Sequence, residues 1–264
     1  MALSNYPPGV TGREPQIAGG WDERDDDWIV ECCSAASIPD LEVNLLWTDV
    51  PFGTGKWQKG RSGKYHDPAE VGYVCEALKS WTHIMSSDGT IVICADYRNA
   101  CDLVSAITDE GWVYRGEIIW EFGLGRPRTD WWPVRHNNLM TFTRTDKSGI
   151  FKAEFAPKER RLAPKKGYSD DKPAGSVWNF TMSNTDPERV HYPNQKPLAI
   201  VEPFVLCHTN EDDLVADPFM GSATTGVAAL AHGRRFYGSD VSPEAVKVAK
   251  GRLANVGDTQ MGLL

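Results

Sequence analysis

The sequence predicts an α/β fold built on a parallel, doubly wound sheet. Short apolar segments of strand length alternate along the chain with longer segments of helical periodicity. Several short segments are apolar throughout, which is typical of strands buried on both faces of a sheet. The 264 residues, 41% hydrophobic and 24% charged, suit one domain of above-average size, and no apolar run approaches the ~20 residues of a membrane span.

In the first half of the chain, strand and helix alternate from residue 43 onward. Residues 43–49 (VNLLWTD) form an apolar run that ends in an acid, which predicts a buried strand. Apolar side chains recur at helical spacing over residues 68–87, and Asp67 followed by Pro68 is a helix start. The pattern then predicts a strand over 89–95, a helix over about 99–110 that stops at Gly111, and strands over 112–120 and 137–144.

An irregular stretch precedes the second half of the pattern. From residue 145 to about 190 the periodicity is lost, and residues 144–172 hold nine Lys or Arg against five Asp or Glu. Regularity returns with a helix over about 197–209, a strand over 213–219, a helix over about 222–233 and a strand over 234–240. Ser242 as N-cap and Pro243 as first helical residue predict a last helix.

Composition and patterning also set the expected domain organisation. We expect a flexible, Pro- and Gly-rich lead-in over residues 1–20 and a single domain over residues 21–264, with residues 145–190 as an insertion. The lead-in lacks the features of a secretory signal. The six cysteines include no C-x-x-C pair, which favours a reduced, cytoplasmic protein without a zinc site. The net charge of -8 weighs little against nucleic-acid binding, because charge distribution matters more than the sum.

Acidic residues lie at or near the ends of three of the predicted strands. Sheets of this kind bind ligands beyond the carboxyl ends of their strands, where Asp49 and Asp217 are expected. After Asp217, Gly221 makes a tight turn and small residues open a helix, so a ligand can approach its N-terminal N–H groups. About twenty residues on, Asp240 is spaced to accept hydrogen bonds from both ribose hydroxyls. The G-x-G-x-x-G fingerprint is absent, so a dinucleotide is not the natural ligand.

Four motifs, in their order, resemble one family of enzymes. DPFMGSATT, followed by GRRFYGSD, resembles the S-adenosyl-L-methionine-binding region of the amino-group DNA methyltransferases, and TDVPFG resembles their D-P-P-Y/F catalytic motif. HYPNQKP (191–197) resembles the H-P-x-Q-K-P element of the β class, whose motif order this chain also shares over roughly residues 28–255. The resemblance implies a three-layer, Rossmann-like methyltransferase sheet, mostly parallel, with circularly ordered motifs and residues 145–190 as target-recognition insertion.

The resemblance also implies a set of cofactor-binding residues. Asp240 would hold the ribose of S-adenosyl-L-methionine, and Lys196 would lie near its methionine end. The full set lines the turn after the cofactor strand, the end of the next strand and the Q-K-P element: Asp217, Pro218, Phe219, Gly221, Ser222, Thr224, Asp240, Gln195 and Lys196.

The stretch DVPF (49–52) has the groups that methylation of an exocyclic amino group needs. The lone pair of such a nitrogen is delocalised into the base, and two acceptors for its N–H bonds pull it toward tetrahedral geometry. Asp49 can supply one acceptor and the main-chain carbonyl of Val50 the other, with Pro51 stiffening the turn. Phe52 offers a face on which a flipped base can stack, worth roughly 1–3 kcal/mol. Methyl transfer is then in-line, without a covalent intermediate. The chain departs from the family at Val50, where Pro is usual.

Double-stranded DNA is the expected partner; a homodimer is left open, and no membrane or metal is expected. Basic residues in the loop GRPRTDWWPVRHN (125–137) and in the insertion can neutralise phosphates. The residues expected to contact DNA are Arg126, Arg128, Arg135, Arg160, Arg161, Lys165 and Lys166.

We expect methylation of adenine N6 at a specific sequence, because relatives with Asp opening the catalytic motif are more often adenine enzymes. Cytosine N4, more often associated with Ser there, is the nearest rival. Methylation at cytosine C5 is disfavoured, since that chemistry needs a nucleophilic Cys, usually after Pro, and the chain has no Pro-Cys pair. Two further hypotheses are a non-catalytic member that binds DNA or a partner enzyme, and an enzyme that methylates RNA or a protein amide.

Overall fold

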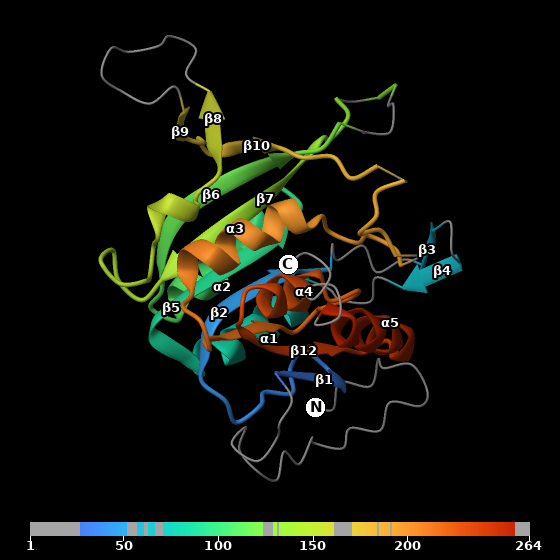
Figure 1. The fold of residues 1–264 in the computed structure, drawn as a ribbon, viewed down its shortest axis with the longest axis horizontal. Coiled ribbons are helices and arrows are strands. Elements are labelled where there is room, and N and C mark those ends of the chain that lie inside the picture. Colours follow the sequence, from blue (N-terminus) through green and yellow to red (C-terminus); the bar gives the residue numbers. More distant parts are fainter. Residues whose placement is uncertain are drawn as a thin grey trace.

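A computed structural model shows an eight-stranded sheet with helices on both faces (Figure 1). It describes residues 27–51, 57–60, 63–66, 71–123, 129–130, 132–160, 171–183, 185–190 and 192–256. The sheet consists of β1 (Trp28–Cys32), β2 (Val43–Asp49), β5 (Met85–Ala95), β6 (Val113–Glu121), β7 (His136–Thr143), β10 (Val177–Asn179), β11 (Leu214–Asp217) and β12 (Arg235–Asp240). Its strand order is β1-β12-β11-β2-β5-β7-β6-β10.

The remaining elements are helices and two small hairpins. The helices are α1 (Val71–Thr82), α2 (Ala100–Asp109), α3 (Leu198–His208), α4 (Thr224–Ala231) and α5 (Pro243–Ala254), with a 3-10 turn η2 (Ala153–Phe155). The hairpins pair β3 (Trp57–Gly60) with β4 (Gly63–His66), and β8 (Lys158–Arg160) with β9 (Asp171–Pro173). No helix in the described ranges is long and apolar enough to span a bilayer.

The sheet separates two hydrophobic cores, so the fold has three layers. Side chains of β2 alternate between them: Leu46 packs in one core with α1 and α2, and Leu45 and Trp47 pack in the other with α3, α4 and α5. All three side chains are at most 1% exposed. This arrangement confirms the predicted α/β fold, and it explains why the strand reads as apolar throughout.

Most predicted elements lie within a few residues of the observed ones, with one correction. The helix expected over 68–87 ends at Thr82, because Met85 already begins β5 and pairs with Val43 of β2. The sheet is mostly parallel, as the resemblance implies, and its exception is β7, which runs antiparallel to both β5 and β6. An antiparallel neighbour needs no crossover helix, and the described parts of the β6–β7 connection contain none.

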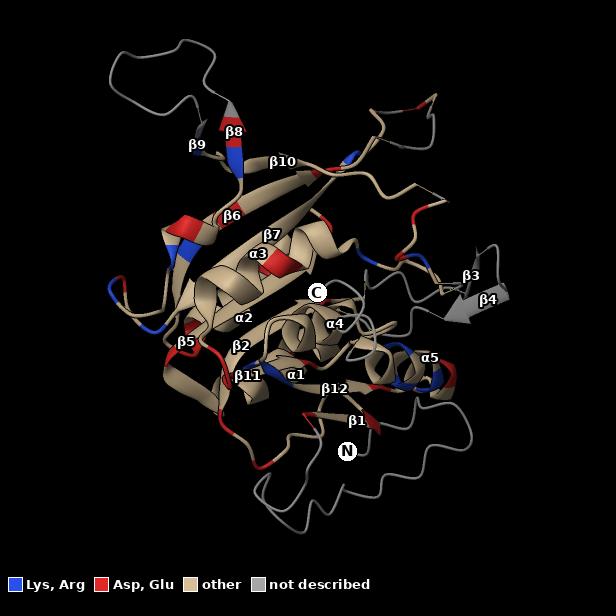
Figure 2. Ribbon diagram, viewed as in Figure 1, with Lys and Arg blue, Asp and Glu red and all other residues tan. Residues whose placement is uncertain are grey.

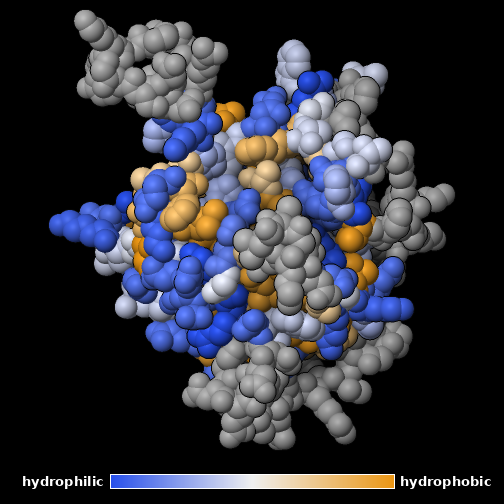
Figure 3. Space-filling view, in the orientation of Figure 1, coloured by the Kyte–Doolittle hydropathy of each residue, from blue (hydrophilic) through white to orange (hydrophobic). Residues whose placement is uncertain are grey.

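The insertion expected over residues 145–190 is irregular for much of its described length, but it contributes β10 to the sheet edge beside β6. Its charges are mixed: Figure 2 shows both acidic and basic residues on β8, and η2, which follows Lys152, carries Glu154. Lys172 pairs with Glu159 at 2.6 Å. Hydrophobic side chains reach the surface beside η2 in Figure 3, and Phe151 is 64% exposed. The boundaries of the insertion as a recognition unit stay a prediction.

Two glycines let α4 and the turn before it lie directly against β12. A Cβ added to Gly226 of α4 would lie 2.5 Å from the ring of Phe236, and one added to Gly238 of β12 would lie 2.7 Å from the sulfur of Met220 in the turn. Both distances are far below van der Waals contact, so a larger residue at either position would displace these side chains. This close packing fixes the turn between β11 and α4, in which Met220 N–H donates to Ser239 O at 3.1 Å.

Candidate active site

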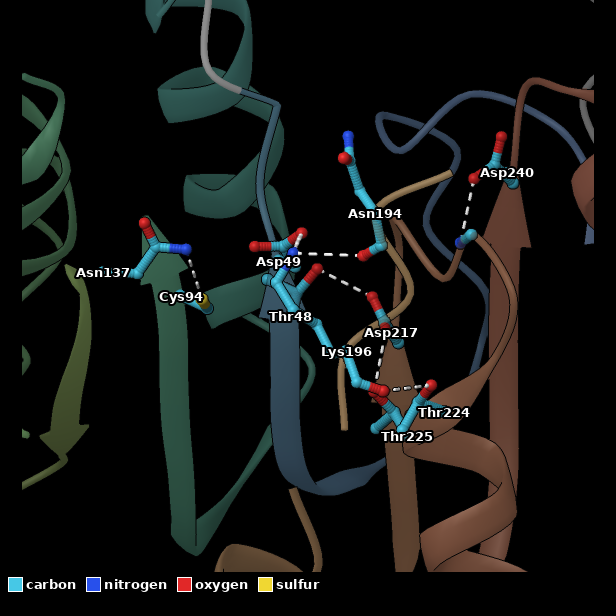
Figure 4. Close-up of polar contacts among 11 residues, drawn as sticks. Thr48, Asp49, Cys94, Asn137, Asn194, Lys196, Asp217, Thr224, Thr225 and Asp240 are labelled. Carbon is cyan, nitrogen blue, oxygen red and sulfur yellow. Dashed lines mark hydrogen bonds and ion pairs between the residues drawn. The ribbon is translucent and has the colours of Figure 1, made fainter. Parts of the chain in front are cut away.

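Three neighbouring parallel strands end in an acid at the same edge of the sheet. β2 ends at Asp49, β11 at Asp217 and β12 at Asp240. The strands are adjacent in the order β12-β11-β2, so their carboxyl ends meet, and Figure 4 shows the three side chains along one edge. The edge predicted from the sequence to bind ligands is therefore assembled as expected.

Both carboxylate oxygens of Asp217 accept hydrogen bonds from neutral donors. It is 3% exposed, and its Oδ1 accepts from Thr48 Oγ1 at 2.7 Å and from Phe219 N at 3.1 Å, while Oδ2 accepts from Thr225 Oγ1 at 2.8 Å. Burial raises its pKa to about 7, although these three bonds act in the opposite direction. Asp217 therefore ties β2, its own turn and α4 together.

Asp49 is held by a cation on one side only. Lys196 Nζ forms an ion pair with Asp49 Oδ2 and donates to Asn194 O at 3.3 Å. Burial alone would lower the pKa of Lys196, but Asp49, helped by Cys94 and Asp217, outweighs it and raises that pKa. Asp49 Oδ1 is buried and has no hydrogen-bond partner among the described residues. A buried acceptor in that state is suited to a donor from a ligand.

Val50 continues the strand by one more hydrogen bond. Its N–H donates to Cys94 O at 3.1 Å, and its side chain is 2% exposed in the core beside α1 and α2. A proline at this position could not make that bond. Pro51 is half-buried next to it, and Phe52 lies outside the described residues. Val50 therefore fixes the direction of the backbone where the second acceptor is expected.

Asp240 organises the turn expected to approach the cofactor. Its Oδ2 accepts from Gly221 N at 3.0 Å and its Oδ1 from Ser242 N at 2.8 Å. Each carboxylate oxygen can accept a further bond. Burial raises the pKa of Asp240, and the two backbone bonds oppose that rise. Gly221 has φ of +50°, and a Cβ there would lie 3.4 Å from the ring of Tyr192.

Tyr192 is a site residue that the sequence analysis did not single out. Its pKa is raised by burial and then by the charge of Asp240, and it hydrogen-bonds to Ser242. It therefore stands beside both Gly221 and Asp240, on the side of the Q-K-P segment. The only sequence signal was its position inside HYPNQKP, where the tyrosine had no assigned role.

Gln195 is used to shape its own loop. Its Oε1 accepts from Val190 N and its Nε2 donates to Glu188 O, both at 2.7 Å. The Glu188 carboxylate in turn accepts from Leu198 N at 3.0 Å, at the start of α3. These bonds hold the segment that presents Lys196. The expected cofactor role of Gln195 stays a prediction.

The start of α4 is clamped by an arginine of α5. Arg252 Nη1 donates to Ser222 O at 2.7 Å, to Ser222 Oγ at 3.2 Å and to Thr224 Oγ1 at 3.1 Å. Thr224 Oγ1 donates to Lys196 O at 3.0 Å. Pro218 O accepts from Ser239 Oγ at 3.4 Å. The polar side chains of Ser222 and Thr224 thus join α5, the turn before α4 and the segment that carries Lys196.

The expected DNA-contacting residues are described only in part. Arg135 is exposed, with its carbonyl accepting from Phe122 N at 2.9 Å, and the nearby Trp132 is 80% exposed. Arg160 is placed by its backbone alone, opposite Asp171 in the β8–β9 hairpin. The other five, Arg126, Arg128, Arg161, Lys165 and Lys166, lie outside the described residues.

The three-layer α/β sheet, with a small-residue turn and three acids at one edge, is a Rossmann-like fold of the kind that binds ligands at the carboxyl ends of its strands. The family model described as DNA methylase, which covers the N6 and N4 amino-methyltransferases, matches residues 43–251. The chain belongs to this family of S-adenosyl-L-methionine-dependent DNA methyltransferases. The family predicted from the four motifs is thereby confirmed.

Two curated relatives match over most of their length. The DNA adenine methyltransferase YhdJ of Escherichia coli (strain K12) is 24% identical over 229 residues, covering 82% of this chain and 78% of that protein. The type II methyltransferase M.HpaI of Haemophilus parainfluenzae is 26% identical over 224 residues, covering 82% of this chain and 70% of that protein.

Solved structures share the fold. The M1.HpyAVI–SAM complex superposes with a TM-score of 0.64 at 23% identity, covering 86% of this chain and 98% of that one. The PvuII DNA methyltransferase, described as cytosine-N4-specific, gives a TM-score of 0.64 at 17% identity, covering 88% and 91%. At these identities the likeness establishes the fold of the chain.

Proposed function

We propose that the chain methylates the exocyclic N6 of adenine in double-stranded DNA, at a specific sequence and on a base flipped out of the helix. The observation that carries the proposal is the hydrogen bonding of the Asp49 carboxylate. One oxygen of its carboxylate is fixed by Lys196, and the other is buried without a partner in the described part of the chain. Such an oxygen is suited to accept an N–H bond from an amino group placed beside it.

The site residues act on the amino group by positioning and by hydrogen bonding. Asp49 Oδ1 accepts one N–H bond, and the main-chain carbonyl of Val50 accepts the other, on a backbone whose direction is fixed by the bond to Cys94 O. The nitrogen lone pair is then released from the ring. When bound, S-adenosyl-L-methionine supplies the electrophilic methyl group. The rate gain comes from fixed geometry and electrostatics.

The residues at the other end of the edge fit the cofactor. Each oxygen of Asp240 has one backbone donor and room for another, as two ribose hydroxyls require. Gly221 leaves the turn without a side chain, and Tyr192 stands beside it. We assign the ribose to Asp240, and the wall of the cofactor site to Pro218, Phe219, Gly221 and Tyr192.

The proposed contacts with DNA involve residues that the structure describes only in part. Phe52 stacks on the flipped base, and the arginines and lysines named for DNA contact neutralise phosphates. Residues 145–190 serve as the recognition segment of a single domain over 21–264. We place the protein in the cytoplasm, a location that its six free cysteines support.

Adenine is favoured over cytosine on two grounds. The catalytic motif opens with Asp49, as it more often does in adenine enzymes. One of the relatives that match over most of their length is named a DNA adenine methyltransferase. The cytosine-N4-specific structure shares the fold at 17% identity, which bears on architecture alone.

The deciding experiment uses purified protein, unmethylated genomic DNA and S-adenosyl-L-methionine, with digestion to nucleosides and mass spectrometry. N6-methyladenine is expected with the wild type and none with Asp49→Ala, while calorimetry shows that the variant still binds the cofactor. N4-methylcytosine would mean that the same mechanism acts on cytosine rather than on adenine. Cofactor binding without any methylated nucleoside would overturn the proposal and favour a non-catalytic member.

A further inference from the structure

We propose that Lys196 is a positioning residue: it holds Asp49 by Oδ2, so that Oδ1 alone is presented to the target amino group. The inference rests on the proposed function and deepens it. It also changes the role of Lys196, which the sequence resemblance places near the methionine end of the cofactor. In Figure 4, Lys196 and Asp49 come from segments far apart in the sequence and lie together at the end of β2.

The lysine is anchored at both of its ends. Its side chain is 9% exposed, and Nζ donates to Asp49 Oδ2 and to Asn194 O at 3.3 Å. Its own carbonyl accepts from Thr224 Oγ1 at 3.0 Å, which ties it to the start of α4. Asn194, two residues earlier, has φ of +56°, so the loop turns back on itself there. Such anchoring fixes the direction from which the cation meets Asp49.

The ammonium charge of Lys196 is already paired with Asp49 at the end of β2. An ammonium group has three donors, of which two are occupied within the protein. A buried cation is stable only beside an anion, and its nearest one is Asp49. Losing that contact to reach a ligand would leave both charges buried and unpaired. Holding Asp49 is therefore the role that the contacts support.

The surroundings of Asp49 show why a cation is needed there. In the described residues, three titratable groups face it: Lys196 from the Q-K-P segment, Asp217 from β11 and Cys94 from β5. Asp217 is acidic, and the buried Cys94 has a pKa raised well above its usual range by burial and by Asp49. Of these three groups, only Lys196 is a cation that pairs with the carboxylate. Without it, the carboxylate would lose the bond that fixes its rotation, and the direction of Oδ1 would no longer be set.

The test compares Lys196→Met with the wild type and with Lys79→Met. Methionine keeps the length and removes the charge, while Lys79 of α1 is a lysine paired with a carboxylate, Glu76 Oε1, at 3.2 Å and outside the strand-end edge. We expect Lys196→Met to lower kcat by about 10²-fold. Lys196→Arg, which keeps the charge and the donor, should recover part of that loss. Lys79→Met should leave kcat unchanged.

Two readouts do not depend on turnover. Calorimetry should give a cofactor Kd within about threefold of the wild type, since a tenfold change corresponds to about 1.4 kcal/mol of lost contact. A crystal structure of Lys196→Met should show the Asp49 carboxylate turned from its wild-type orientation, whereas Lys79→Met should keep that orientation. The structural result is expected even if the wild type methylates nothing.

The outcomes separate the inference from the proposed function. A wild type that methylates no nucleoside overturns the proposed function, and the orientation of the Asp49 carboxylate in Lys196→Met then decides the Lys196 inference alone. A cofactor Kd weakened more than about tenfold, with the Asp49 carboxylate in its wild-type orientation, makes Lys196 a cofactor ligand and overturns the inference. Retained kcat in a folded Lys196→Met would overturn it as well.

Discussion

Two carboxylates on neighbouring strand ends are held in opposite ways. Asp217 accepts three hydrogen bonds from neutral donors and has no oxygen left without a partner. Asp49 is paired with the cation of Lys196, and its Oδ1 has no partner in the described residues. A carboxylate whose oxygens are all bonded to neighbouring elements suits a structural role, whereas one with a vacant acceptor oxygen suits catalysis. The contrast supports the proposal that Asp217 is structural and Asp49 catalytic.

The largest effect is expected from a substitution of Asp49, the carboxylate proposed to be catalytic. Asp49→Asn keeps the size of the side chain but places a neutral amide against the buried Lys196. We expect kcat to fall by about 10³-fold, because the positioned acceptor and the charge are lost together. Single-turnover assays on DNA measure the loss, and calorimetry checks that the cofactor still binds. Near-wild-type turnover would remove Asp49 from the mechanism.

The second prediction compares the two threonines that donate to Asp217. Thr48→Val and Thr225→Val each remove a buried donor to a carboxylate, at a cost of about 1.5–3 kcal/mol in unfolding free energy. Thr48 adjoins Asp49, so its valine variant should also reduce kcat, whereas Thr225→Val should spare it at a temperature where it is folded. Urea unfolding and steady-state kinetics give the two numbers.

The serine variants at the same positions are the matched controls, since they keep the hydroxyl group. Thr48→Ser and Thr225→Ser should each recover most of the lost stability. If both valine variants lowered kcat to the same degree, Asp217 would belong to the catalytic group rather than to the framework.

A third prediction follows from the raised pKa of Asp217, which is about 7 through burial against an ordinary value of 3.8. Between these two pH values the unfolded chain has lost a proton that the folded chain retains. Asp217 therefore stabilises the fold fully below about pH 4, and its contribution is lost as the pH rises to about 7. Urea unfolding of the wild type and Asp217→Asn across this range should show their difference in unfolding free energy falling, then levelling. A constant difference would mean that Asp217 does not titrate there.

The sequence predicts the convergence of the three acids because parallel strands bring their carboxyl ends to one edge. It does not predict the partners of those acids. Thr48 lies 169 residues from Asp217, and Lys196 lies 147 residues from Asp49. A threonine inside an apolar strand is typical of any strand, and a lysine near a strand end is typical of solvated surface. Contacts between distant segments decide both roles, and no local pattern records them.

The smallest effect is expected at Val50, where relatives usually have Pro. Val50→Pro removes the N–H bond to Cys94 O and replaces a side chain that is 2% exposed in the core. We expect about 1–2 kcal/mol less unfolding free energy and a kcat within about threefold of the wild type. The backbone carbonyl proposed as second acceptor is kept by either residue, and proline fixes the turn by its ring instead of by a hydrogen bond. Thermal unfolding and DNA methylation assays measure the two changes. A gain in kcat of tenfold or more would mean that Val50 weakens the catalytic turn, and that the bond to Cys94 O is a poorer constraint than the proline ring.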